Sequence, residues 1–352
     1  MRFLKGLSPT VIGRAAAVIT IVIWTSFIVI ARASADPARG ATLTPFDIVL
    51  ARILGASLIL LPWGWWLVQR DRAVALDAAH GAGAGGVARP PESSLFGLSP
   101  LSLRITVTTG VFGGLLYAML AYSGFVFAPA AHASVLMPGS LPLWTALLAV
   151  WVLGTRITPA RALGLAFIVA GDLMVGGASL LHAFDGGNVW RGDVLFMVAA
   201  LCWSVYSVLA RRHALDAVRA TIAITALAFC TYVPVYGLLL ALQAVPSHFL
   251  TAPVGDVLFQ MLFQGVGSVV ISGITFTKMI QHFGPVRSTM MTAVVPGLSA
   301  LAATFFLGEP LHWNLVAGLA LVTVGILFGV RTATPVAIKS EAAHADAMRA
   351  GG

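Results

Sequence analysis

The chain has 352 residues, of which 59% are hydrophobic and only 10% charged, and its formal net charge is +8. Soluble domains contain roughly 25% charged residues, so this composition excludes a soluble globular protein and indicates an integral membrane protein. Cys202 and Cys230 fall inside apolar runs without metal-ligand spacing, and we expect neither a metal nor another cofactor.

Ten apolar segments follow one another along the chain, each close to the roughly 20 residues that cross a bilayer as a helix. Helices are required because lipid offers backbone groups no hydrogen-bond partners. The predicted spans are 11–31, 46–69, 103–124, 130–153, 160–181, 192–212, 219–244, 257–280, 286–307 and 311–330. Residues 33–35 after the first span look like a signal-peptidase site. We expect the span to be retained, because its sequence around Trp24 recurs in the sixth span.

The stretch 71–100, between the second and third spans, is polar and contains the glycine-rich run 81–86. Such low-complexity sequence is typical of flexible connectors, and we expect a cytoplasmic loop without a catalytic role. The tail 331–352 is also polar and rich in alanine, and we expect it to be disordered.

The second half of the chain repeats the first. Trp24 aligns with Trp203 at a separation of 179 residues, and later pairs align at 154, so the first half holds about 25 extra residues, which 71–100 supplies. The pairs at 154 include Ser134 and Ser288, Pro142 and Pro296, Gly154 and Gly308, Gly164 and Gly318, and Gly171 and Gly325. This pattern predicts two five-helix repeats, 11–181 and 192–330, and substrate sites of such transporters lie between the repeats.

The positions of the basic residues predict the orientation. With the amino terminus inside, 17 of the 21 Lys and Arg residues fall in inside segments and three in outside loops. This excess places both termini in the cytoplasm and requires an even number of spans, so the two repeats face opposite ways. We therefore expect a multi-pass protein of the inner cell membrane, and the basic charge needs no nucleic-acid partner.

The landmarks of both halves resemble the EamA-type branch of the drug/metabolite transporter superfamily. The second span opens with Thr44-Pro45-Phe46, and the repeats end in Leu153-Gly154-Thr155 and Leu307-Gly308-Glu309, each followed by glycines seven residues apart. The family usually has Glu after Leu-Gly in both copies, whereas this chain has Thr155 in the first. The resemblance implies ten helices around a central cavity and transport of amino acids, related metabolites or drugs without ATP.

Two ionisable residues lie within predicted spans. Asp172 is roughly 14 Å from either surface, too deep for its short side chain to reach water, and a charge there costs about 2.5–3.5 kcal/mol. It should face the bundle interior, either as a proton-coupling or substrate-ammonium site or as a structural hydrogen-bonding group. Arg52 is about 9 Å deep, so its side chain either snorkels to the outer interface or binds a carboxylate. The opposite directions of the two spans would allow these residues to meet in the outer half of the membrane.

The first and sixth spans share an aromatic and hydroxyl pattern. Aromatic side chains in mid-span can line a cavity and stack on a ring, or anchor a helix at the interface. The candidate substrate residues from these patterns and from the repeat alignment are Trp24, Ser26, Trp203, Tyr206, Ser134 and Ser288.

These features predict an all-α integral membrane protein, with ten transmembrane helices arranged as two inverted five-helix repeats, that works as a secondary transporter. Its partners are the lipid bilayer and a small amphipathic metabolite such as an amino acid, moved outward, with a proton as the candidate coupling ion. No phosphate-binding loop or catalytic motif is present, so we do not expect an enzyme. The alternative is a non-transporting membrane scaffold or a lipid-handling, scramblase-like protein, which would place its polar groups in a groove open to the bilayer.

Overall fold

The structure is a computed structural model that describes residues 9–81, 92–182 and 186–331. In these ranges all the regular secondary structure is helical, apart from an isolated β-bridge between Ser94 and Ser99. The long helices are α1 (Pro9–Ala35), α2 (Pro45–Gly81), α4 (Leu116–Phe127), α6 (Leu141–Leu153), α7 (Pro159–His182), α8 (Val189–Arg212), α9 (Ala217–Ala241), α11 (Ser272–Phe283), α13 (Val295–Leu307) and α14 (Trp313–Arg331). Shorter pieces that extend them are α3 (Leu103–Gly110), α5 (Ala130–Ser134), α10 (Val254–Gln260) and α12 (Pro285–Met291).

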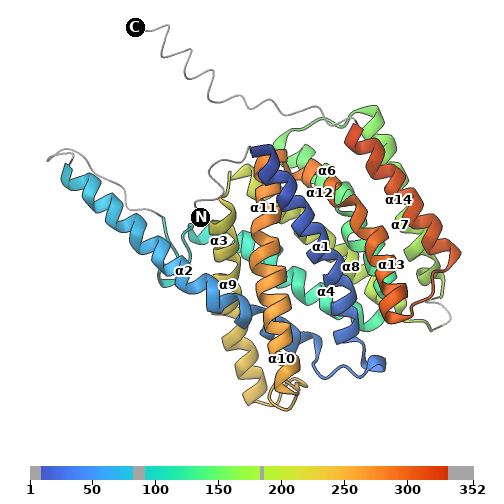
Figure 1. The fold of residues 1–352 in the computed structure, drawn as a ribbon, viewed down its shortest axis with the longest axis horizontal. Coiled ribbons are helices and arrows are strands. Elements are labelled where there is room, and N and C mark those ends of the chain that lie inside the picture. Colours follow the sequence, from blue (N-terminus) through green and yellow to red (C-terminus); the bar gives the residue numbers. More distant parts are fainter. Residues whose placement is uncertain (1–8, 82–91, 183–185, 332–352) are drawn as a thin grey trace, which may run out of the picture.

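The helices lie side by side in one bundle (Figure 1). Nine helical segments of the described chain are long and apolar enough to cross a membrane. The tenth predicted span corresponds to a shorter apolar helix, Trp313–Phe328. The all-helical, multi-span membrane class is therefore confirmed, and the count of ten remains a prediction.

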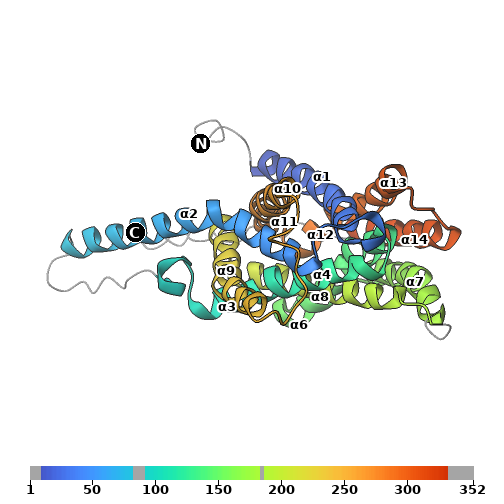
Figure 2. The same ribbon diagram turned by 90° about the horizontal axis from the view of Figure 1, so that it is seen from below.

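The stretch after the second span differs from the expected flexible loop. α2 continues without a break to Gly81, because residues 70–81 are mostly good helix formers such as Ala, Leu and Arg. Asp71 on this extension forms an ion pair with Arg219 at the start of α9. The extension projects from the bundle in both views (Figures 1 and 2). Residues 82–91, which include the rest of the glycine-rich run, and the tail from 332 lie outside the described residues.

Two loops at the repeat ends have the same backbone geometry. Gly154 ends α6 with φ 65° and ψ 22°, and Gly308 ends α13 with φ 65° and ψ 21°. Both angles fall in the left-handed region, which glycine adopts without steric cost, and this explains the Leu-Gly pair at both positions.

The glycines spaced seven apart form the contact between α7 and α14. A Cβ atom added at Gly171 would lie 2.6 Å from the carbonyl oxygen of Gly318, and one added at Gly325 would lie 2.4 Å from that of Gly164. Since 164 pairs with 325 and 171 with 318, the two helices run antiparallel. Exchanging the repeats maps one contact onto the other, as an inverted repeat requires. Small residues allow this close approach of two backbones in a membrane.

Three spans contain a π-helical segment: η4 (Val111–Leu115), η5 (Val135–Gly139) and η7 (Met261–Ile271). Adding the repeat separation of 154 to 111–115 gives 265–269, which lies inside η7. Both repeats therefore carry a π-helical segment at the same place in the third helix of the unit. π-helical turns are rare in proteins, and those that occur are often found at functional sites. Both of these segments contribute to the cavity described below.

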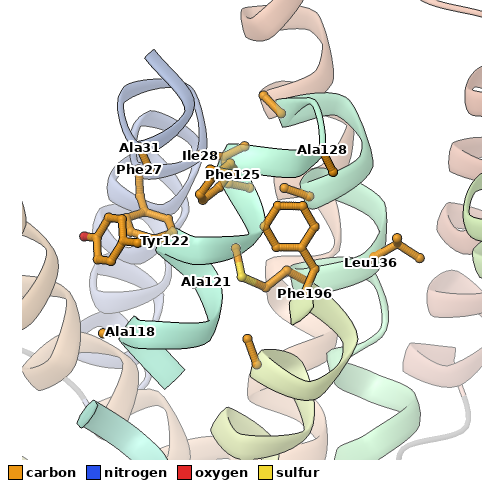
Figure 3. Close-up of a cluster of buried hydrophobic side chains, with 14 of the residues drawn as sticks. Phe27, Ile28, Ala31, Ala118, Ala121, Tyr122, Phe125, Ala128, Leu136 and Phe196 are labelled. Carbon is orange, nitrogen blue, oxygen red and sulfur yellow. The ribbon is translucent and has the colours of Figure 1, made fainter. Parts of the chain in front are cut away.

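The packed core between α1, α4 and α8 combines aromatic rings with alanine and larger aliphatic side chains (Figure 3). The ring centroids of Phe27 and Tyr122 are 5.8 Å apart, and those of Phe125 and Phe196 are 4.9 Å apart in an edge-on arrangement. Such offset geometry is favourable for ring pairs. The core joins both halves of the chain and fixes the hydroxyl of Tyr122 beside the cavity.

Candidate functional site

A cavity lies between helices of both halves of the chain, and we name it the central cavity. Its walls come from α2, η4, α4, α8, α9, η7 and α11. The described lining residues are Val49, Arg52, Ile53, Ala56, Gly113, Gly114, Leu115, Ala118, Trp203, Tyr206, Thr221, Ile224, Thr225, Ala228, Ser268, Val269 and Gly273. A mainly apolar lining with a few polar groups is characteristic of small-molecule sites.

Arg52 is the charged member of this described lining, and its side chain does not reach the surface. The residue is only 6% exposed, so snorkelling does not explain it. Its Nη1 donates to Ser268 Oγ at 3.1 Å and more weakly to Tyr122 Oη at 3.4 Å. Both partners are neutral hydroxyls, so the guanidinium keeps an uncompensated positive charge at the cavity wall. The residue aligned with it in the second half, 179 residues on, is Thr231, so the fold itself does not require an arginine there.

A second cavity is smaller than the central one. Trp203 lines both cavities. The second cavity is otherwise lined by Trp24, Phe27, Ile28, Tyr117, Met137, Pro138 and Leu141. Met137 and Pro138 belong to η5, so a π-helical segment borders this cavity as well.

The repeat-related tryptophans meet at the centre of the molecule. The ring centroids of Trp24 and Trp203 are 5.8 Å apart in an edge-on contact. Tyr206 and Phe276 pack against Trp203 with centroids 5.4 and 5.5 Å away. Two positions that the repeat relates can touch only near the axis that relates them. The predicted aromatic pattern therefore marks the interface of the two halves.

Hydrogen bonds hold two of these rings in place. Trp24 Nε1 donates to Ser272 Oγ at 2.9 Å, and Tyr206 Oη pairs with Thr277 Oγ1 at 2.6 Å. The indole Nε1 of Trp203 and the hydroxyl of Thr225 are buried without a partner in the described structure. An unpaired buried donor is costly, so a ligand or water that satisfied these groups would be stabilised.

Asp172 lies apart from this constellation. It is buried on α7, it is not among the described residues that line either cavity, and neither of its carboxylate oxygens has a hydrogen-bond partner. The meeting with Arg52 that the span directions would allow does not occur, because the partners of Arg52 are two hydroxyls. Gly176 lies one turn after Asp172 on α7. A Cβ atom added at Gly176 would contact Leu136 of η5 and would lie 4.0 Å from Asp193 Oδ2 of α8. The carboxylate thus belongs to a different part of the bundle, and a structural hydrogen bond does not account for it.

The predicted serines do not line either cavity among the described residues. Ser26 donates to the carbonyl of Val22 and Ser288 donates to that of Gly284. Ser134 is buried, donates to the carbonyl of Ala130 and accepts from Ser299 Oγ at 3.0 Å. Hydroxyls in membrane helices commonly bond to the carbonyl one turn back, and these contacts are of that kind.

Glu309 takes a structural position that its place in the sequence did not reveal. Its carboxylate accepts from the backbone N–H groups of Ala130 and Ala131 at 3.3 Å, at the start of α5. It also pairs with Arg32 of α1, whose Nε lies 3.2 Å away. A negative charge is favoured at a helix amino terminus, so Glu309 both caps α5 and ties it to α1. Thr155 stands at the equivalent place in the first half, and it cannot supply this charge.

The sequence reasoning missed several residues around the site. Ser268 and Tyr122, which hold Arg52, carry no motif and become neighbours only through helix packing. A second pair, His132 Nδ1 and Asp193 Oδ1 at 2.9 Å, joins α5 to α8. Both residues lie inside predicted spans, where ionisable side chains are rare, so the sequence offered a signal for this pair.

Comparison with known proteins gives the family. The model of the EamA-like transporter family matches residues 11–177 and again residues 190–331. The chain belongs to the EamA-like transporter family. The double match agrees with the internal repeat of the sequence.

Two curated relatives of this family member are named as transporters without an assigned substrate. An uncharacterized transporter, YyaM, of Bacillus subtilis (strain 168) is 26% identical over 62% of this chain and 69% of its own length. An uncharacterized transporter of Archaeoglobus fulgidus is 25% identical over 80% of this chain and 86% of its own length. A solved crystal structure aligns with 91% of this EamA-like chain at a TM-score of 0.52 and 20% identity, which supports the fold alone. The family and its relatives therefore indicate a transporter of the drug/metabolite type.

Proposed function

We propose that the protein is a secondary active transporter that exports a small amphipathic metabolite through the central cavity. The observation that carries the proposal is the placement of this cavity between the two halves, with the repeat-related Trp24 and Trp203 in contact beside it. Inverted-repeat transporters bind their substrates at such an interface and expose the site alternately to each side by rocking one repeat against the other.

The π-helical segments η4 and η7 support this mechanism. A π-helical turn leaves irregular backbone pairing, and in a membrane such backbone is tolerated where it borders a cavity or is buried in protein. Gly113 and Gly114 of η4 and Ser268 of η7 line the central cavity. We infer that these segments are where the third helix of each repeat bends as the cavity changes its access.

Asp172 is our candidate for the coupling residue. Its carboxylate is buried on α7 without a hydrogen-bond partner, and a membrane transporter can use a buried acid to bind a proton from one side. The residue aligned with it in the second half is Ile326, so the fold does not require an acid there. Since Asp172 lies apart from the central cavity, proton and substrate would compete through the conformational equilibrium rather than for one site.

The experiment is transport by the purified full chain in proteoliposomes, with a panel of labelled metabolites and with or without a pH gradient. We expect at least one small metabolite to cross the proteoliposome membrane faster than it crosses protein-free liposomes. Cells that express the protein should also retain less of this metabolite than cells that lack the protein. Failure of every compound, together with rapid flip of labelled phospholipid, would replace this proposal with the lipid-handling alternative.

A further inference from the structure

Resting on the transport function proposed above, we infer that the central cavity selects organic anions, namely small aromatic monocarboxylates, over zwitterionic amino acids and over amines. This narrows the substrate class from amphipathic metabolites in general. The inference comes from the charges, the free donors and the ring surfaces of the cavity walls.

The charge of the walls has one sign. Among the described residues that line the two cavities, Arg52 is the one whose side chain is charged at neutral pH. Neither Asp nor Glu is among these residues. Its contacts are the hydroxyls of Tyr122 and Ser268, which carry no charge. A buried cation without a counter-charge is costly, and an anionic ligand would supply the missing partner.

The guanidinium has donors to spare. The two hydrogen bonds of Arg52 both come from Nη1, and its Nε and Nη2 have no partner in the described structure. The Nε–Nη2 edge of a guanidinium is a planar fork that matches the two oxygens of a carboxylate. Thr225 and Trp203 line the same cavity, and the hydroxyl of the first and the indole N–H of the second are buried without a partner.

The remaining walls favour a flat apolar group. Trp203 and Tyr206 border the central cavity, and Trp24 and Tyr117 continue the aromatic surface into the second cavity. The ring centroids of Tyr117 and Trp203 are 4.9 Å apart. A ligand with its carboxylate on Arg52 could place a ring against these faces.

An ammonium group has no comparable partner. Asp172 is the acid that the sequence offered for this role, but it is not among the described residues lining either cavity. An amine would therefore face Arg52 without a carboxylate to compensate it, and like charges in a site of low dielectric repel strongly. A zwitterion would gain the contact with Arg52 and still leave its ammonium group unpaired.

The test uses probes that share one ring and differ in charge. Binding is measured as thermal stabilisation of the detergent-purified full chain by 3-phenylpropionate, phenylalanine, phenethylamine and 3-phenylpropanol, and the binding is repeated with benzoate and indole-3-acetate. We expect the acids to bind more tightly than the other probes. In Arg52→Gln the dissociation constant for the acids should rise roughly ten- to a hundred-fold, since a hydrogen bond to a charged group is lost. That for the alcohol should stay within about two-fold.

Two further variants serve as controls. Arg72→Gln removes a positive charge from the exposed extension of α2, far along the helix from the cavity, and should leave acid binding unchanged. Arg52→Lys keeps the charge and removes the planar fork, so it should bind acids with an intermediate constant. Arg52 has no carboxylate partner in the described structure, so Arg52→Gln breaks no ion pair and should purify as a folded protein.

The outcomes separate this inference from the transport proposal. Binding of the acids that depends on Arg52, without transport of any compound of the metabolite panel in proteoliposomes, would uphold the anion site and count against the transport proposal. Transport of phenethylamine or phenylalanine in preference to the acids would uphold transport and overturn the anion inference. If none of the three acids binds, or if they bind Arg52→Gln as tightly as the unmodified protein, the inference is wrong.

Discussion

The contact between α7 and α14 makes a quantitative prediction, because two glycines there have no room for a methyl group. In Gly171→Ala, the new Cβ would lie 2.6 Å from the carbonyl oxygen of Gly318. An ordinary contact begins near 3.4 Å, so the helices would have to separate by about 0.8 Å. No rotation of a side chain can relieve this contact, since the obstructing atom belongs to the backbone.

A separation of that size weakens the whole interface. A gap of 0.5–1 Å forfeits about a quarter to a half of each dispersion contact, and overpacking of this kind costs typically about 1–3 kcal/mol. Gly325→Ala, the repeat-related change, would place its Cβ 2.4 Å from the carbonyl oxygen of Gly164 and should cost a similar amount. Because both changes push the same helices apart, the double variant should lose less stability than the sum of the losses in the two single variants.

The assay is unfolding of the purified protein in detergent, followed by tryptophan fluorescence at increasing denaturant or temperature. Gly177→Ala on the same helix is the matched control, since no atom lies within 4 Å of its added Cβ. This control should be neutral or stabilised by up to about 1 kcal/mol, because alanine is the better helix former. If Gly171→Ala and Gly325→Ala unfold like the control, the close antiparallel contact, and with it our argument for the repeat axis, is wrong.

Four further outcomes are expected. Asp172→Asn should fold and bind substrate yet lose transport driven by a pH gradient, and normal pH-dependent transport in this variant would reject the coupling role. Glu309→Ala should destabilise the protein by about 1–3 kcal/mol in the same unfolding assay, because two backbone donors and an arginine lose their acceptor, and it should leave the affinity for substrate unchanged. Single cysteines in a background without native cysteines should be labelled from the cytoplasm at position 80 and from outside at position 250, and an external 80 would contradict the inverted orientation. Deletion of 82–91 should leave insertion and thermal stability intact, and loss of stable expression would show that this segment is a structural element.

Much of the architecture follows from the sequence because the bilayer restricts what a chain can do. An apolar run of about 20 residues must become a helix, so the nine recognised spans and most of their limits could be predicted. The repeat also carried three-dimensional information. It paired Trp24 with Trp203, and it related glycines that in the structure form the two symmetric contacts of one helix pair.

The sequence could not determine how each helix is rotated and tilted against its neighbours, since hydropathy is nearly uniform around a buried membrane helix and packing alone sets these angles. That is why Arg52 and Asp172, both within predicted spans and of opposite charge, seemed natural partners. The tertiary structure separates them and gives Arg52 two hydroxyls instead. Composition therefore determined that this chain lies in the membrane, and the repeat indicated where its halves meet. Only the packing of the helices decided which side chains share the cavity, because contacts between distant spans depend on an orientation that no local pattern records.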